Sequence, residues 1–189
     1  SRQSFQTSTT NGTTGIYALP NGTGTAASWQ ATNAADPTNA SKILIATNGS
    51  TDVQLVSGRN GTGTYLPLTF YTNGSEQLRL DTSGNVGIGV TPSAYTGLTR
   101  AIDMYVYGTV NTGDDGSRAY IAIGSNYYEA PAGTQKYKVT SATIPASMYR
   151  QRDGQHQWFY APNGTAGNTI SFTQAMTLED RKSTRLNSS

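Results

Sequence analysis

The chain has no cysteine, a single histidine and few aliphatic side chains. Without cysteine it has no disulfides, no thiolate nucleophile and no cysteine-ligated metal site. No stretch approaches the roughly 18 to 20 consecutive apolar residues that a membrane-spanning helix needs, and no basic segment followed by an apolar one opens the chain. We therefore expect no membrane insertion and no disulfide-stapled fold.

Leu, Ile, Val and Phe make up about 16 % of the 189 residues, whereas Ser, Thr, Asn and Gly make up about 43 %. So few aliphatic residues would suit a disordered chain if the net charge were high, but the formal net charge is only +2 and twelve tyrosines add bulk. A compact enzyme domain of this length buries more aliphatic surface. The composition favours a β-rich chain that completes its core by pairing with copies of itself.

The last ten residues, DRKSTRLNSS at 180–189, resemble the in-frame translation of a short-read sequencing adapter. This tail holds three of the 13 basic residues and one of the 11 acidic residues, so the rest of the chain has ten of each and no net charge. Because nucleic-acid binding needs a clustered positive surface, we expect no nucleic-acid partner. The tail and the start at Ser1 rather than Met indicate a fragment from an environmental read.

Turn signals recur along the chain and predict β-hairpins. The Asn-Gly pair occurs six times, and both of its residues tolerate the positive φ that a two-residue type I′ turn requires. Two-residue turns at Asn48-Gly49, Asn73-Gly74 and Asp153-Gly154 predict the cross-strand pairs Leu44 with Val53, Thr69 with Leu78, and Tyr149 with Trp158. No stretch sustains an apolar period of 3.6 residues, so we expect an all-β fold.

Residues 78–92, which read LRLDTSGNVGIGVTP, hold the most specific motif of the chain. After a turn at residues 83–85, alternation with period two places apolar residues on one face of a strand and glycines on the other. Glycine in a strand lets another backbone approach closely, as three chains around one axis would require. The motif predicts a trimer-packing strand made of Val86, Gly87, Ile88, Gly89 and Val90.

This motif closely resembles the strand–turn–strand unit of bacteriophage tail fibre and tail spike proteins, which often precedes an endosialidase-type intramolecular chaperone domain. Residues 68–81 and 165–178 are similar to the same family's approach to that unit, and the resemblance covers much of residues 60–179. The resemblance implies an elongated, hairpin-rich fibre segment that is completed as an intertwined homotrimer and is located in the virion.

Four segments follow from the motifs and the tail. We expect a β-rich fibre segment at 1–59 and a hairpin with the glycine-alternating strand at 60–99. A β-rich module at 100–179 would end in the start of a second repeat, and 180–189 would be a non-native tail.

The one histidine falls in the Asp153-Gly154 hairpin, among aromatic and amide residues. Alternation places five side chains on one face of this hairpin, namely Tyr149, Gln151, His156, Trp158 and Tyr160. Aromatic rings stack on sugar faces while amides and hydroxyls bond sugar hydroxyls, so this face suits a carbohydrate. Burial of the rings between the chains of a trimer explains the same residues. Both interpretations stay open at this point.

Residue types that commonly carry catalysis do not form a recognisable set. The motif's glycines follow the order GxxGxG with no Walker lysine, and Pro92 interrupts any following helix, so we expect no nucleotide. Asp114-Asp115-Gly116 is typical of a turn, because EF-hand spacing is absent. The ten acids outside the tail form no glycosidase pair. We predict no catalytic residues, no metal site and no cofactor.

The residues and the resemblance together predict a structural, non-enzymatic component of a bacteriophage tail fibre, which projects or forms part of the host-recognition apparatus. Its partners would be copies of itself and a host cell-surface glycan. An alternative is a carbohydrate-binding module of a phage or bacterial surface adhesin that uses the aromatic hairpin. A third possibility is a polysaccharide-degrading tail spike.

Overall fold

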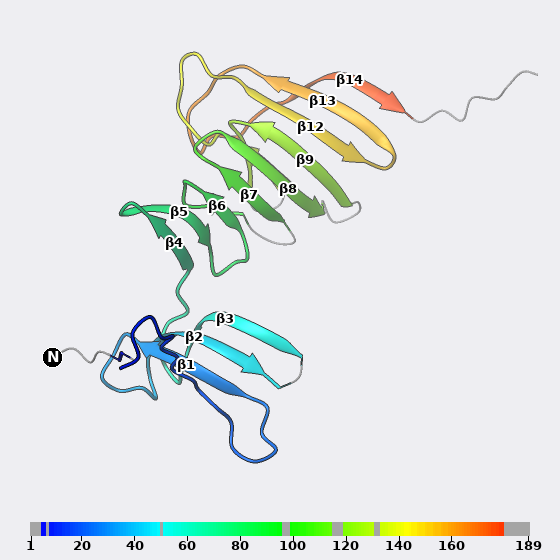
Figure 1. Cartoon of the computed structure of the whole chain (residues 1–189). Coiled ribbons are helices and arrows are strands. Elements are labelled where there is room, and N and C mark those ends of the chain that lie inside the picture. The colour runs from blue at the N-terminus through cyan, green and yellow to red at the C-terminus, as the bar shows by residue number, and fades with distance from the viewer. Residues whose placement is uncertain are drawn as a thin grey trace, which may run out of the picture. The chain divides into compact units, whose positions relative to one another are not determined.

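The computed structural model describes residues 5–6, 8–49, 51–95, 99–114, 119–130 and 133–179, with the backbone alone for Asp114. The chain divides into two compact units, Ser1–Leu66 and Pro67–Ser189, and each is built from β-strands (Figure 1). Strands make up 50 % of the structure and helix 1 %, which confirms the all-β prediction. The tail at 180–189 lies outside the described residues.

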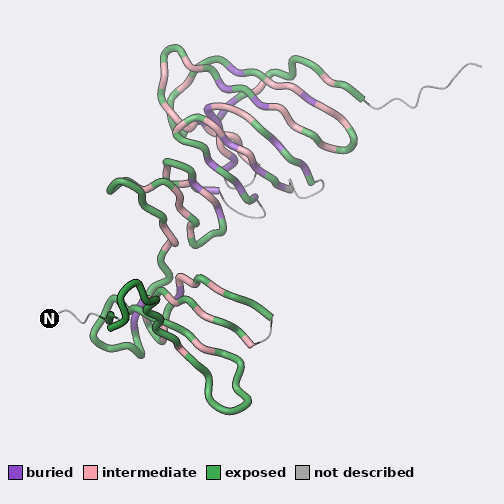
Figure 2. Tube along the Cα trace, viewed as in Figure 1, coloured by how far each residue is buried: buried purple, intermediate pink, exposed green. Residues whose placement is uncertain are grey.

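The N-terminal unit holds a single antiparallel sheet of three strands in the order β1-β2-β3. These strands are β1 (Ala27–Thr32), β2 (Ser41–Asn48) and β3 (Asp52–Arg59). Figure 2 shows that most residues of this unit are exposed or half-buried. The buried hydrophobic residue among its described positions is Ala40, which precedes β2. One layer of three strands therefore encloses almost no core of its own.

The hairpin between β2 and β3 differs from its predicted register. Asn48 stays in β2 and pairs with Asp52, so the connection has three residues rather than the two predicted from Asn-Gly. The amide and the hydroxyl of Thr51 both donate hydrogen bonds to the Asn48 carbonyl oxygen, which closes this longer loop.

A three-residue change in register follows from the longer loop. Leu44 pairs with Val56, so the predicted pairing of Leu44 with Val53 is wrong. Because the change is an odd number of residues, it also exchanges the two faces of β3 relative to the prediction.

The C-terminal unit is organised around a sheet of nine strands in the order β4-β5-β6-β7-β8-β9-β12-β13-β14. All neighbours are antiparallel except β6 and β7, which are parallel. A separate hairpin pairs β10 with β11. The strands are β4 (Leu68–Thr72), β5 (Ser75–Leu80), β6 (Val86–Ile88), β7 (Arg100–Met104), β8 (Gly108–Asp114), β9 (Ala119–Ser125), β10 (Tyr128–Ala130), β11 (Thr134–Lys136), β12 (Ala146–Arg152), β13 (Gln155–Ala161) and β14 (Thr173–Glu179).

The hairpin of β12 and β13 follows its predicted turn chemistry. Asp153 and Gly154 have φ values of 55° and 73°, both in the left-handed region that a type I′ turn needs. Tyr149 lies opposite Trp158 as predicted. The register across this hairpin is therefore fixed by its two-residue turn.

The hairpin of β4 and β5 begins as predicted and then shifts. Thr72 pairs with Ser75 across the Asn-Gly turn, but a β-bulge lies between Phe70 and Tyr71, so Phe70 rather than Thr69 lies opposite Leu78. The prediction is wrong by one residue because the bulge inserts an extra residue into β5. A second bulge interrupts the pairing of β13 with β14, next to Trp158.

The motif at residues 78–92 forms a tight turn between β5 and β6. The Asp81 carboxylate accepts hydrogen bonds from the amides of Ser83 and Asn85, at 2.9 and 2.8 Å, and from the Asn85 side chain at 3.0 Å. The Oδ1 of the buried Asn85 side chain in turn accepts a hydrogen bond from the Ala101 amide of β7, at 3.1 Å. The DTSGN stretch thus positions β6 beside its parallel neighbour.

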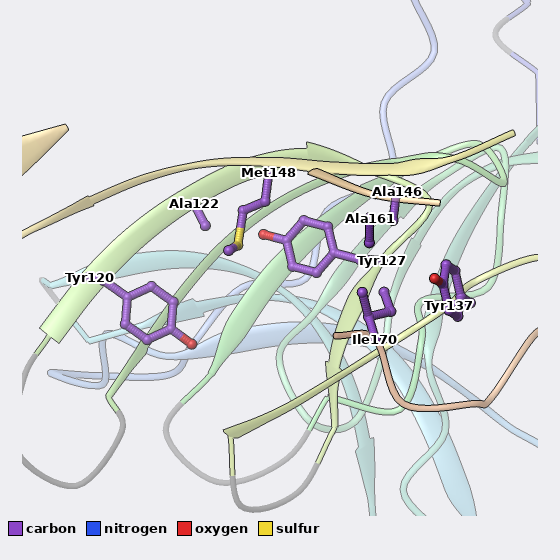
Figure 3. Packing of buried hydrophobic residues seen from close by; sticks show 8 residues of the cluster. All are labelled: Tyr120, Ala122, Tyr127, Tyr137, Ala146, Met148, Ala161 and Ile170. Atoms are coloured by element: carbon purple, nitrogen blue, oxygen red, sulfur yellow. The ribbon is translucent and has the colours of Figure 1, made fainter. Parts of the chain in front are cut away.

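The core of the C-terminal unit lies on one face of the sheet. The segments that follow β9 and β13 pack over this face, where Tyr127 is fully buried and its ring meets the Phe172 ring edge-on with centroids 5.8 Å apart. The Tyr127 ring lies so close to the sheet that only a residue without a side chain fits beneath it at Gly124, where a Cβ would lie 2.5 Å from the ring. The cluster in Figure 3 consists of Tyr120, Ala122, Tyr127, Tyr137, Ala146, Met148, Ala161 and Ile170.

Candidate interaction face

The other face of the nine-stranded sheet carries a row of apolar side chains, one from each strand. Directly paired residues of neighbouring strands point to the same side of a sheet, so the registers trace this row from β4 to β14. It consists of Leu68, Leu80, Val86, Ile102, Val110, Ile123, Tyr149, Trp158 and Met176. We call this row and its two flanking rows the open face.

The two flanking rows differ, since the first is mostly apolar and the second mixes polar residues with two apolar ones. One consists of Phe70, Leu78, Ile88, Met104, Gly108, Ser125, Ser147, Tyr160 and Thr173, and the other of Arg100, Thr112, Ile121, Gln151, His156 and Leu178. Among these positions Arg100, at the end of its row, is the one side chain with a full charge. The open face is therefore a continuous and nearly uncharged surface.

No described segment of the chain covers the open face. Ile123 is 50 % exposed and Met176 52 %, whereas Ala122, the neighbour of Ile123 on the opposite face, is fully buried. Each position on one face of a sheet occupies about 4.8 Å by 6.8 Å, so the three rows together span about 800 Å². Their sixteen apolar positions account for about 520 Å², which is near the upper end of the largest apolar patches of monomers, about 300–600 Å², and patches of that size are often functional. Such a surface marks a place where something else binds.

The five predicted residues of the aromatic hairpin all lie on the open face. Tyr149 is the centre of the group, because its ring is 5.3 Å from the Trp158 ring and 6.0 Å from the His156 ring. The Tyr149 hydroxyl is hydrogen-bonded to His156 Nδ1. Gln151 and Tyr160 are exposed beside them. Tyr149, His156 and Trp158 thus form one contacting ring cluster.

The glycine-alternating strand is shorter than predicted. β6 ends at Ile88, and Gly89 has a φ of 66°, so the alternation breaks and Val90 lies outside the strand. Val86 and Ile88 belong to the open face. A Cβ on Gly87 would overlap the Val90 carbonyl oxygen. Within one chain, the backbone that approaches Gly87 is therefore that of Val90.

Two sets of predicted residues therefore meet on one surface. The aromatic hairpin of β12 and β13 and the apolar residues of β6 were expected as separate features, and the sheet joins them through three intervening strands. The aliphatic residues that complete the surface, such as Ile102, Val110 and Ile123, were not predicted. Their alternation in β7, β8 and β9 was the available signal.

A buried ion pair lies on the covered face of the same sheet. Lys138 Nζ is 2.7 Å from Asp103 Oδ1, with the side chains 4 % and 0 % exposed. The same carboxylate accepts hydrogen bonds from the Tyr95 hydroxyl at 2.6 Å and from the Ser93 amide at 2.7 Å. Lys138 also donates to the Gly108 carbonyl oxygen at 3.1 Å. The pair fastens the covering segment to β7 and β8.

The hydrogen bonds set the charge state of this pair. Burial on its own raises the pKa of the Asp103 carboxyl, but hydrogen bonds from Lys138, Tyr95 and the Ser93 amide together hold that pKa below its ordinary value. Burial lowers the pKa of Lys138, and Asp103 opposes this shift. Sequence reasoning missed the pair because its members are far apart in the chain and belong to no local pattern.

Other candidate chemistry finds no support in the described residues. No group of three or more His, Cys, Asp or Glu side chains among them is placed to hold a metal ion. No helix in that part of the chain is long and apolar enough to cross a membrane. In the predicted Asp114-Asp115-Gly116 turn, only the backbone of Asp114 is described.

The N-terminal sheet also leaves one apolar face uncovered. Its registers place Trp29, Ile45 and Leu55 side by side, with Ile43 and Val53 adjacent on the same face. All five are at least 45 % exposed. An open hollow of about 720 Å³, lined mostly by apolar atoms, lies over this face. Both units thus present an unpaired apolar sheet face.

No known protein family, curated protein or solved structure matches the chain. The fold and the open face define it as an all-β protein built from open, single-layered sheets.

Proposed function

We propose that the chain is a structural segment of a bacteriophage tail fibre, which assembles as a homotrimer in the virion and carries or forms part of the host-recognition apparatus. The open face is the observation that carries this proposal, because about 520 Å² of its area of about 800 Å² is apolar sheet that the C-terminal unit leaves partly exposed. The resemblance of residues 78–92 to the strand–turn–strand unit of tail fibres supplies the class of assembly.

The energetics favour association. If copies bury half of the apolar positions of the open face, the transfer of about 260 Å² at about 25 cal/mol per Å² contributes about 6.5 kcal/mol per chain. This gain has to exceed the loss of translational and rotational freedom, which is about 4–15 kcal/mol per association. The uncovered face of the N-terminal unit adds to the gain. Association therefore stabilises the fold where a single chain lacks a second layer.

Sedimentation equilibrium of the purified chain tests the proposal. We expect a mass three times that of the 20.0 kDa chain, and elongated particles by negative-stain electron microscopy. A folded monomer at micromolar concentration would refute both the trimer and the fibre role. A globular dimer would refute the fibre role while keeping self-association.

A second candidate function is supported by the ring cluster. Tyr149, His156 and Trp158 form an aromatic platform of the kind that stacks on sugars, and the Gln151 amide lies next to it. In this role the chain is a carbohydrate-binding module of a surface adhesin. Glycan-array binding that is lost in Trp158→Ala, while the mass by sedimentation stays unchanged, would favour this candidate. Absence of glycan binding by the wild-type chain would remove it.

A further inference from the structure

We infer that the open face is the contact surface between copies of this chain, with its central row buried and the ring cluster acting as a packing anchor rather than as a sugar platform. The inference rests on the proposed self-assembly and goes beyond it, because it assigns the surface. It also assigns Tyr149 and Trp158 to one of the two roles that the sequence left open.

The size of the open face fits a specific protein interface. Its area of about 800 Å², polar positions included, equals what each partner contributes to a standard protein–protein contact. The strands at its centre, β8 and β9, contribute Val110 and Ile123, so the least polar part is surrounded on all sides by further side chains of the sheet. This arrangement is typical of an interface core with a rim.

The charge on the open face favours a second copy as the occupant. Arg100 is the one fully charged side chain, and it lies at the end of a flanking row. Copies packing around an axis bring the same residues of each chain close together, which a charged face would oppose. A nearly uncharged face can pack against the same face of a second copy without charge repulsion. It also offers little charge to attract an acidic or basic partner.

The N-terminal unit supports the same occupant. Trp29, Ile45 and Leu55 form a second uncovered apolar face in a separate unit of the chain. Each unit therefore presents an apolar face that a partner can cover. Copies of the chain can cover both faces at once, whereas a different protein would have to match each face separately.

The contacts of the ring cluster favour packing over sugar binding. A sugar site presents free donors and acceptors beside the stacking ring, but the Tyr149 hydroxyl and His156 Nδ1 are hydrogen-bonded to each other. Ile123, Met176 and Leu178 pair directly with the three rings, although Gln151 and Ser147 also border the cluster. Rings within an aliphatic surface are typical of interface anchors.

Single-cysteine labelling tests the inference directly, because the chain has no cysteine of its own. Ser147→Cys places a thiol at an exposed position of the open face, and Ile123→Cys places one at its centre. Ser83→Cys, in the exposed turn before β6, is the matched control away from the face. In the full-length assembled protein we expect maleimide to react with both face positions at least about tenfold more slowly than with the control.

The outcomes separate this inference from the proposed function. If the wild-type chain sediments as a monomer, both fail. If it sediments as an oligomer and the face cysteines react as fast as the control, the assignment of the surface is overturned while self-assembly stands. If Trp158→Ala abolishes glycan binding in an intact oligomer, the anchor role of the cluster is overturned.

A charge introduced at the centre provides a second readout. Ile123→Asp should shift the sedimenting mass from oligomer to monomer at concentrations where the wild-type chain is fully associated. Tyr105→Asp, at an exposed aromatic residue in the turn between β7 and β8, is the control that should leave the mass unchanged. An oligomeric Ile123→Asp variant contradicts the inference, and if that variant does not fold, the labelling experiment decides.

Discussion

Replacing one member of the buried Lys138–Asp103 pair should destabilise the C-terminal unit strongly. Removal of one partner from a buried ion pair costs about 3–5 kcal/mol, since it leaves the other charge uncompensated. In Asp103→Asn, Lys138 keeps the Gly108 carbonyl oxygen and a neutral amide oxygen as acceptors but loses its buried counter-charge, so we expect a loss within this range, nearer about 5 kcal/mol. In Lys138→Met, the carboxylate keeps the donors Tyr95 and Ser93, so we expect a loss near 3 kcal/mol, about the lower limit for such pairs.

The double variant tests whether the cost comes from the unpaired charge. Asp103→Asn combined with Lys138→Met leaves no buried charge at this place, so its loss should be smaller than the sum of the single losses by about 1–3 kcal/mol. The free energy of unfolding is measured by urea denaturation at one fixed protein concentration, because association shifts the apparent stability. Arg79→Met, at the partly exposed ion pair with Glu76, is the control that should change little. Strictly additive losses, or single losses below about 1 kcal/mol, would refute the reasoning.

Three further predictions concern the same unit. The pKa of Asp103 is lower in the folded chain than in the unfolded one, so the unfolded chain takes up the proton first as the pH falls. The free energy of unfolding should therefore decrease as the pH drops through about 4, and it should decrease less steeply in Asp103→Asn. Equal pH profiles of the two proteins by urea denaturation would contradict this. Gly87→Ala should lower the thermal midpoint, because its Cβ overlaps the Val90 carbonyl oxygen, and an unchanged midpoint by circular dichroism would show that the backbone has room. Tyr105 has a φ of 51°, a conformation that costs a non-glycine residue about 1–2 kcal/mol. Tyr105→Gly removes this backbone strain, so it should raise the thermal midpoint of unfolding. A lower midpoint would show that the contacts of the ring outweigh the strain.

Local turn chemistry explains which parts of the fold could be predicted. The Asp153-Gly154 hairpin has two residues with positive φ and the predicted register throughout. At Asn48-Gly49 the same chemistry failed, because Thr51 closes a loop one residue longer and Asn48 remains in its strand. A dipeptide signals a turn, but the pairing beyond it depends on side chains that the dipeptide does not contain.

The open face could be predicted only in pieces. Period-two alternation correctly grouped Tyr149, His156 and Trp158 on one side of a hairpin. Their position on the same surface as Val86 depends on the parallel pairing of β6 with β7 and on the strand order between them. Neither follows from local sequence, because both are set by contacts between segments far apart in the chain. The Lys138–Asp103 pair escaped prediction for the same reason.

The two β-bulges have a consequence for how such a sheet associates. They occur in the pairings of β4 with β5 and of β13 with β14, which are the outermost pairs, whereas the inner pairs keep a regular register. An edge strand offers unpaired amides and carbonyls to any further strand, and a bulge twists that edge away from flat pairing. Strand-by-strand growth into an amyloid-like ribbon is thereby disfavoured at both ends of the sheet, and a chain with this much outward apolar surface stays protected from its most hazardous mode of aggregation.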